Sequence, residues 1–184
     1  MAGALRKIVV GRADVGISAY VAAGGAGTFT DAGYTRGPAT IEDSTSDLEI
    51  SAEQVLGKLS SVPIDKKVVV KFWMLEADLA NLQKALRQPA GNLTGTPPNS
   101  SLAVGDPVEV YHQVQFVTKG IRGTSGGASA TRTITFWRAA FGPMEPIGFP
   151  KDGEQIYGVT MSVMYDDSVA TADKYYKEVD TGAT

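Results

Sequence analysis

The chain has no cysteine and only one histidine, His112, in 184 residues. The absence of cysteine excludes disulfides, thiolate nucleophiles and the zinc sites that use cysteine ligands. His112 falls on the apolar side of its predicted strand, and the sequence indicates no nucleophile or carboxylate that would act with it. We therefore expect a core or interface histidine, and we predict neither an enzyme nor a bound cofactor.

Long apolar runs and an excess of positive charge are also missing. No run approaches the roughly 20 apolar residues that span a bilayer, and the apolar stretch near the start is too short for a signal peptide. We expect no membrane partner, and assembly in a cytoplasm. The formal net charge of -3 argues against a protein that grips the nucleic-acid backbone, but it does not exclude one that lets nucleic acid pass.

The composition that remains is typical of one globular domain over residues 1–184, with 43% hydrophobic and 20% charged residues. The stretch from Lys66 to Pro89 is predicted to be a strand followed by the only helix. Acidic residues Glu76 and Asp78 favour the first helical turn, and Pro89 ends the helix. Leucines recur at the spacing of one helical stripe. The residues expected to pack this helix on the outside are Leu75, Leu79, Leu82 and Leu86.

Three further stretches alternate apolar and polar residues, as half-buried strands do. They cover residues 108–118, 131–141 and 155–165, and a shorter strand begins at Leu48. Pro63 is expected to interrupt the chain before the central strand, and residues 151–154 to form a hairpin turn. The pattern predicts a mainly β protein, antiparallel and sandwich-like or barrel-like, with one amphipathic α-helix packed on the outside.

Glycine, proline and small polar residues mark the connections. We expect a loop arm at about residues 22–46, a long loop at 90–107, and a polar C-terminal arm at about 168–184. The glycine-rich segments 23–28 and 123–127 lack the sequence and the following helix of a phosphate loop or a nucleophile elbow, and are predicted to be plain loops. The acidic pairs Asp166–Asp167 and Asp152 with Glu154 lack the ligand spacing of a calcium loop, so we expect turn or cap roles and no metal.

Three stretches, in this order, resemble the tail tube proteins (major tail proteins) of long-tailed bacteriophages. They are residues 48–57, LEISAEQVLG; the strand-to-helix unit that ends with residues 76–86, EADLANLQKAL; and residues 149–155, FPKDGEQ, continuing through the last predicted strand to residue 168. The resemblance extends over most of the chain from about residue 40. It implies the phage tail tube fold, which is similar to that of tube subunits in contractile tails and type VI secretion.

The resemblance implies a structural protein of the virion tail. Six copies would form a ring, and rings would stack into a hollow tube that conducts double-stranded DNA from the capsid into the host. The implied partners are further copies of the chain, a tape measure protein inside the tube, and tail terminator and distal tail proteins at its ends. DNA would pass without specific binding.

This hypothesis implicates two sets of residues. A polar channel wall, over which DNA slides, is expected to contain Glu109, Gln113, Gln115, Thr133 and Thr135. The loop that contacts the neighbouring ring is expected to contain Tyr34, Arg36, Glu42 and Asp43.

Two other classes of function stay open at this point. A monomeric β-sandwich would bind carbohydrate or protein through its glycine-rich loops, and its small oligomer size would distinguish it from a tube subunit. An enzyme would need a polar cluster assembled from distant parts of the chain. Loss of function in His112→Ala without loss of assembly would favour the enzyme.

Overall fold

The computed structural model describes residues 6–10, 13–25, 27–33, 35–51, 58–75, 78–121, 130–148, 151 and 155–181. Within these residues the chain is mainly β, with one α-helix, α1 (Leu79–Ala85), and three short 3-10 helices. No helix in this part of the chain is long and apolar enough to cross a membrane. The strands are β1 (Arg6–Val10), β2 (Ala13–Ala19), β3 (Thr30–Asp31), β4 (Ala39–Ser51), β5 (Lys58–Met74), β6 (Leu93–Thr96), β7 (Asn99–Leu102), β8 (Tyr111–Ile121), β9 (Ala130–Phe141), β10 (Tyr157–Val163) and β11 (Tyr176–Thr181).

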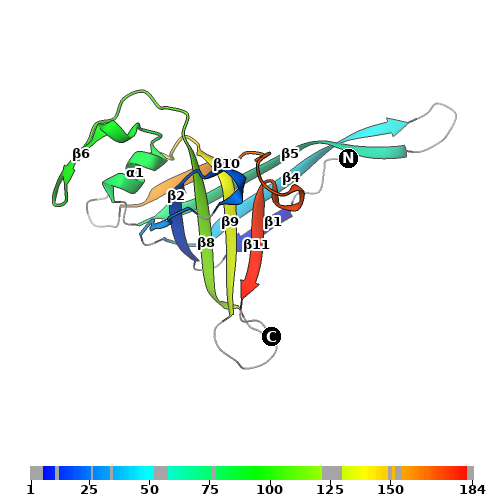
Figure 1. The fold of residues 1–184 in the computed structure, drawn as a ribbon, viewed down its shortest axis with the longest axis horizontal. Coiled ribbons are helices and arrows are strands. Elements are labelled where there is room, and N and C mark those ends of the chain that lie inside the picture. Colours follow the sequence, from blue (N-terminus) through cyan, green and yellow to red (C-terminus); the bar gives the residue numbers. More distant parts are fainter. Residues whose placement is uncertain are drawn as a thin grey trace.

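Nine strands form one antiparallel sheet in the order β1-β4-β5-β10-β9-β8-β2-β3, with β11 also paired to β9. Strand β9 joins the two halves of this sheet. Its residues 139–141 pair with β10, its residues 131–136 pair with β11, and its other edge pairs with β8. In Figure 1, the axes of β8, β9 and β11 are roughly aligned, and they cross the axes of β4 and β5. The predicted antiparallel β architecture with one helix is therefore confirmed.

The hydrophobic core lies between these two halves of the sheet. Phe72 on β5 meets Phe116 on β8 edge-to-face, with ring centroids 5.5 Å apart, although the two strands are not hydrogen-bonded neighbours. Phe116 in turn contacts Phe136 on β9 in the same geometry at 5.9 Å. All three rings are almost completely buried. Because edge-to-face aromatic pairs add to the free energy of burial, this cluster fixes how the two halves pack.

The predicted loop arm at residues 22–46 is wrong for its second half, and so is the break at Pro63. Residues 39–51 form β4, which pairs along its length with the 17-residue strand β5. Ala39, Ile41 and Asp43 are all buried, so this Thr- and Ser-rich segment alternates as a strand does. Pro63 is accommodated because it lies at a β-bulge, where the ladder is already interrupted.

The helix is shorter than predicted, and its leucines are not its most deeply buried residues. Asp78 caps it by accepting a hydrogen bond from the Ala80 amide at 3.1 Å. Leu75 precedes the helix and Leu86 follows it, and all four predicted leucines are half-buried. The helix is held instead by polar contacts, such as the Asn81 amide donating to the carbonyl oxygen of Asp31 on β3 at 3.0 Å.

Two predicted loops also contain regular structure. The segment 90–107 holds the β6–β7 hairpin, and the Gln88 side chain ties it back by bonding both the amide and the carbonyl of Gly105. The predicted C-terminal arm is a strand of the main sheet, because β11 pairs with β9 from Tyr176 to Thr181. The predicted turn at residues 151–154 and the loop at 123–127 lie largely or wholly outside the described residues.

The aromatic cluster makes a testable prediction about stability. We expect Phe116→Ala to lower the free energy of unfolding by about 3–5 kcal/mol, because it removes a fully buried ring and leaves a cavity between the two halves of the sheet. Val104→Ala, at a side chain that is 67% exposed, should change it by about 0.5 kcal/mol or less. Urea denaturation followed by fluorescence measures both, and equal losses would contradict this account of the core.

Candidate functional site

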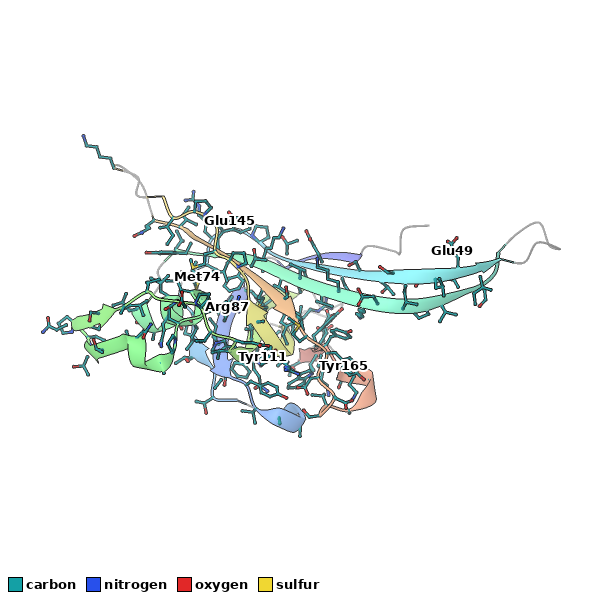
Figure 2. The ribbon with its side chains drawn as sticks, turned by 90° about the horizontal axis from the view of Figure 1, so that it is seen from above. Glu49, Met74, Arg87, Tyr111, Glu145 and Tyr165 are labelled. Carbon is teal, nitrogen blue, oxygen red and sulfur yellow. The ribbon has the colours of Figure 1, made fainter. Side chains whose placement is uncertain are left out.

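The β4–β5 hairpin projects from the body of the protein as a two-stranded arm. β1 pairs with β4 only from Ala39 to Asp43, and β10 pairs with β5 only from Val68 to Met74. Residues 44–51 and 58–67 therefore pair only with each other among the described residues, and we call them the distal arm. Figures 1 and 2 both show this hairpin extending away from the remaining strands, with Glu49 far out along it.

One face of the distal arm is apolar and exposed to solvent. Leu48 lies opposite Val62, and Ile50 lies two residues beyond Leu48 on the same face. Ile64, at the bulge, continues the apolar residues towards the body. Exposures of these four side chains range from 44% for Val62 to 63% for Ile64. Four apolar side chains exposed together on one ribbon are typical of a surface that another molecule covers.

Polar contacts fix the base of the arm to β11 and to the segment before it. Asp43 accepts hydrogen bonds from the Tyr176 hydroxyl at 3.2 Å and from the Lys66 ammonium at 3.1 Å. The Tyr175 hydroxyl donates to the carbonyl oxygen of Lys66 at 3.4 Å. Burial, with Asp65 as the next cause, raises the pKa of Tyr175, so this phenol stays protonated and able to donate.

Two of the four predicted ring-contact residues lie in a strand and not in a loop. Glu42 and Asp43 belong to β4, and Asp43 is buried at the base of the arm. The amide of Arg36 bonds the carbonyl of Trp73 on β5, and Tyr34 lies outside the described residues. The segment that projects is the one immediately after this set, which begins at residue 44.

Three of the predicted channel-wall residues lie together on one face of the sheet, where Gln115 and Thr133 are half-buried and Thr135 is buried. Gln115 on β8 lies opposite Thr135 on β9, and its amide donates to the Thr135 hydroxyl at 3.3 Å. Thr133 lies two residues away on the same face. β11 continues this face with Lys177 beside Thr135 and Val179 beside Thr133. Sequence reasoning missed these β11 residues because it treated the segment as a free arm.

Gln113 is a correction to the predicted wall, and Glu109 lies outside the strand in which it was expected. Gln113 is fully buried, because its amide nitrogen donates to the carbonyl oxygens of Val21 and Gly25, both at 3.0 Å, and its oxygen accepts from the Gly27 amide at 3.0 Å. It holds the glycine-rich loop against the sheet and does not face solvent. Glu109 precedes β8, where its carboxylate accepts a hydrogen bond from the Tyr111 hydroxyl.

The glycine-rich loop is therefore held against the sheet by hydrogen bonds. A β-carbon at Gly27 would collide with the Ser18 hydroxyl and lie 2.8 Å from the Gln113 oxygen, so only glycine fits there. The Ala23 amide donates to the Ser168 hydroxyl, and the Ser168 hydroxyl and amide both donate to the Asp166 carboxylate. Asp166 thus serves a turn, as expected. In the described part of the chain no group of three or more His, Asp or Glu side chains is placed to hold a metal ion.

His112 is a buried core residue whose ring lies 5.3 Å from the ring of Phe141. Burial lowers its pKa, a hydrogen bond with the backbone of Ser18 opposes that shift, and the positive charge of Lys84 adds to it. The imidazole is therefore kept neutral near neutral pH, which suits a packing role.

The sequence matches no known protein-family model and no curated protein. The function of this chain therefore has to be inferred from its own geometry, of which the exposed arm and the polar sheet face are the most distinctive parts.

Gln113→Ala should release the glycine-rich loop. Three backbone groups would lose their partners, so we expect a loss of about 1–3 kcal/mol in unfolding free energy and faster hydrogen exchange at the Gly27 amide. Gln115→Ala is the matched control on the same strand and should cost about 0.5 kcal/mol or less, since Gln115 is partly exposed. Unchanged exchange at Gly27 in Gln113→Ala would show that the loop is held by other contacts.

The lowered pKa of His112 predicts how stability changes with pH. Its folded pKa lies below the unfolded value of about 6.5, so the unfolded chain takes up a proton first as the pH falls. Stability should therefore be retained above pH of about 6.5 and should decrease as the pH falls towards the folded pKa. Because the chain has one histidine, His112→Phe should flatten this decrease. Equal slopes for both proteins in urea titrations between neutral pH and the onset of carboxylate protonation would refute the assignment.

Proposed function

We propose that this protein is a self-assembling structural subunit of a hollow tube, of the kind found in the tails of long-tailed bacteriophages. Rings of six copies stack through the projecting β4–β5 arm, and double-stranded DNA passes through the channel during ejection. The observation that carries the proposal is the distal arm, a two-stranded ribbon that exposes Leu48, Ile50, Val62 and Ile64 on one face.

The physics of isolated hairpins supports this use of the arm. A two-stranded ribbon is at best marginally stable in water, and one with an exposed apolar face invites association with other chains. Covering that face with another copy would stabilise the arm and join the two copies at once.

The second support is the sheet that carries the polar face. Strand β11 pairs with β9 on one edge and has no second strand partner among the described residues, while the two-residue strand β3 ends the other side of this layer. Edge-to-edge pairing between neighbouring copies would close such layers into a barrel and remove their edges. Gln115 and Thr133 would then face a channel, with Asp14 of β2 and Lys177 of β11 on the same face of the sheet.

Electron microscopy of the purified protein over a concentration series tests the proposal. We expect rings or hollow tubes from the unaltered chain, and particles no larger than single rings from the double variant Leu48→Lys/Val62→Lys, because charges on the apolar face oppose its burial. Val104→Lys, at another exposed valine outside the arm, should assemble normally.

Circular dichroism should show the same β content for all three proteins, since both arm positions are exposed. A particle that stays monomeric at the highest concentration, with or without tail-tip components, would overturn the proposal and favour a binding module. Normal tubes from the double variant would show instead that the arm does not join the rings.

A further inference from the structure

We propose that Arg138, at the bulge of β9, binds a carboxylate group presented by a second copy of this chain. The inference rests on the proposed function and adds a contact outside the β4–β5 arm. At the bulge, Trp137 and Arg138 of β9 lie opposite the single residue Gln113 of β8. Because Phe136 and Ala139 on either side are buried in the core, the bulge places Arg138 on the face of the sheet that points away from the core.

Two tyrosine rings contact the Arg138 guanidinium. Its central carbon lies 4.0 Å from the centre of the Tyr111 ring and 5.9 Å from the centre of the Tyr20 ring. The hydroxyls of both rings are already bonded, since Tyr111 donates to Glu109 and Tyr20 donates to Asp166. A guanidinium that lies over an aromatic ring keeps the N–H groups of its edge free, and this edge matches the two oxygens of a carboxylate.

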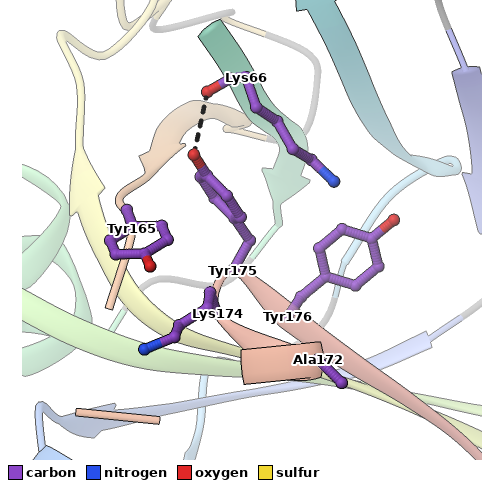
Figure 3. Close-up of a pocket in the computed structure, with 6 residues that line it drawn as sticks. All are labelled: Lys66, Tyr165, Ala172, Lys174, Tyr175 and Tyr176. Atoms are coloured by element: carbon purple, nitrogen blue, oxygen red, sulfur yellow. Dashed lines mark hydrogen bonds between the residues drawn. The ribbon is translucent and has the colours of Figure 1, made fainter. Parts of the chain in front are cut away.

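The Arg138 guanidinium has no acceptor within its own subunit. Among the described residues its Nε is buried without a hydrogen-bond partner, and no carboxylate forms an ion pair with the side chain. The neighbouring lysines differ in this respect. Lys66 and Lys174 line the hollow that Figure 3 shows, and they pair with Asp43 and Asp167 of the same chain. A buried donor without an acceptor costs free energy, so Arg138 favours a partner that supplies one.

The surface around Arg138 has the composition of a contact between proteins. The amide of Met164 donates to the carbonyl oxygen of Arg138 at 2.7 Å, and the Met164 side chain is exposed. Tyr165, the next residue, is 51% exposed. Val21 and Val110, each adjacent in sequence to one of the two tyrosines that contact Arg138, are exposed as well. Methionine, tyrosine and arginine are enriched where proteins contact one another, and tyrosine and arginine often supply most of the binding free energy.

The charges favour a single carboxylate on a protein over the phosphates of DNA. Glu109 and Asp166, which bond the two tyrosines, would repel a polyanion, whereas one carboxylate needs only the edge of the guanidinium. A second copy can supply that carboxylate. The chain has 20 acidic residues against 17 lysines and arginines. Exposed acids without an ion pair in the described part of the chain include Asp106 and Glu145. Opposite charges therefore make a second copy a suitable partner for Arg138.

The threshold concentration at which the purified chain begins to assemble measures this contact. We expect Arg138→Gln to raise the threshold at least about tenfold, because a charged hydrogen-bonded pair is lost. Arg138→Lys keeps the charge but not the two parallel N–H groups, so it should still raise the threshold several-fold. Lys151→Gln removes one positive charge at an exposed residue elsewhere and should leave the threshold unchanged. Light scattering over a dilution series gives the threshold, and circular dichroism shows whether each variant is folded.

Salt separates a contact between charges from simple packing. Raising NaCl from about 50 mM to about 500 mM should bring the thresholds of Arg138→Gln and the unaltered chain closer together, because screening weakens only a pair that is present. Equal thresholds at low salt would overturn this inference and leave the tube proposal standing. A raised threshold that salt does not bring closer would also overturn it, since packing would then account for the effect. Absence of any assembly by the unaltered chain would overturn both proposals.

Discussion

A ribbon of two strands has no layer of its own on which to bury an apolar face. In the body of this protein, Phe72 and Phe116 meet across two halves of one sheet, and each half shields the other from water. Beyond residue 44 of β4 the second half is absent among the described residues. Leu48 and Ile50 lie on the face of β4 opposite to that of the buried Ala39 and Ile41, because strand residues alternate between faces and the extra residue of the bulge is on β5. The arm therefore exposes apolar residues that no layer of the described subunit covers, and in the proposed assembly a neighbouring copy covers them.

The arm is useful for assembly only if its direction is fixed. Asp43 at its base accepts hydrogen bonds from Tyr176 and Lys66, which ties β4, β5 and the start of β11 together. A shift of β11 would thus change the direction of the arm.

Local pattern was sufficient for much of the fold, and it failed where tertiary pairing overrides local preference. The long alternation of β8 and β9 was recognisable from residue type and spacing, whereas Asp78, which was expected inside the first helical turn, is the N-cap that precedes it. The segment 39–46 was mistaken for a loop because threonine, serine and aspartate favour turns, while its burial depends on pairing with β5. Gln113 was placed on the correct sheet face, but no local signal indicated that the glycine-rich loop would cover it.

The candidate site was likewise predictable only where local sequence pattern determines it. The apolar residues of the arm were visible in the sequence, but their exposure was not, because it depends on which strands stop short of them. β1 and β10 both stop pairing with the hairpin at the base of the arm. The hairpin therefore projects beyond the rest of the sheet. The length of the neighbouring strands, as much as the composition of the arm, therefore determines that this hairpin projects from the sheet with its apolar residues exposed.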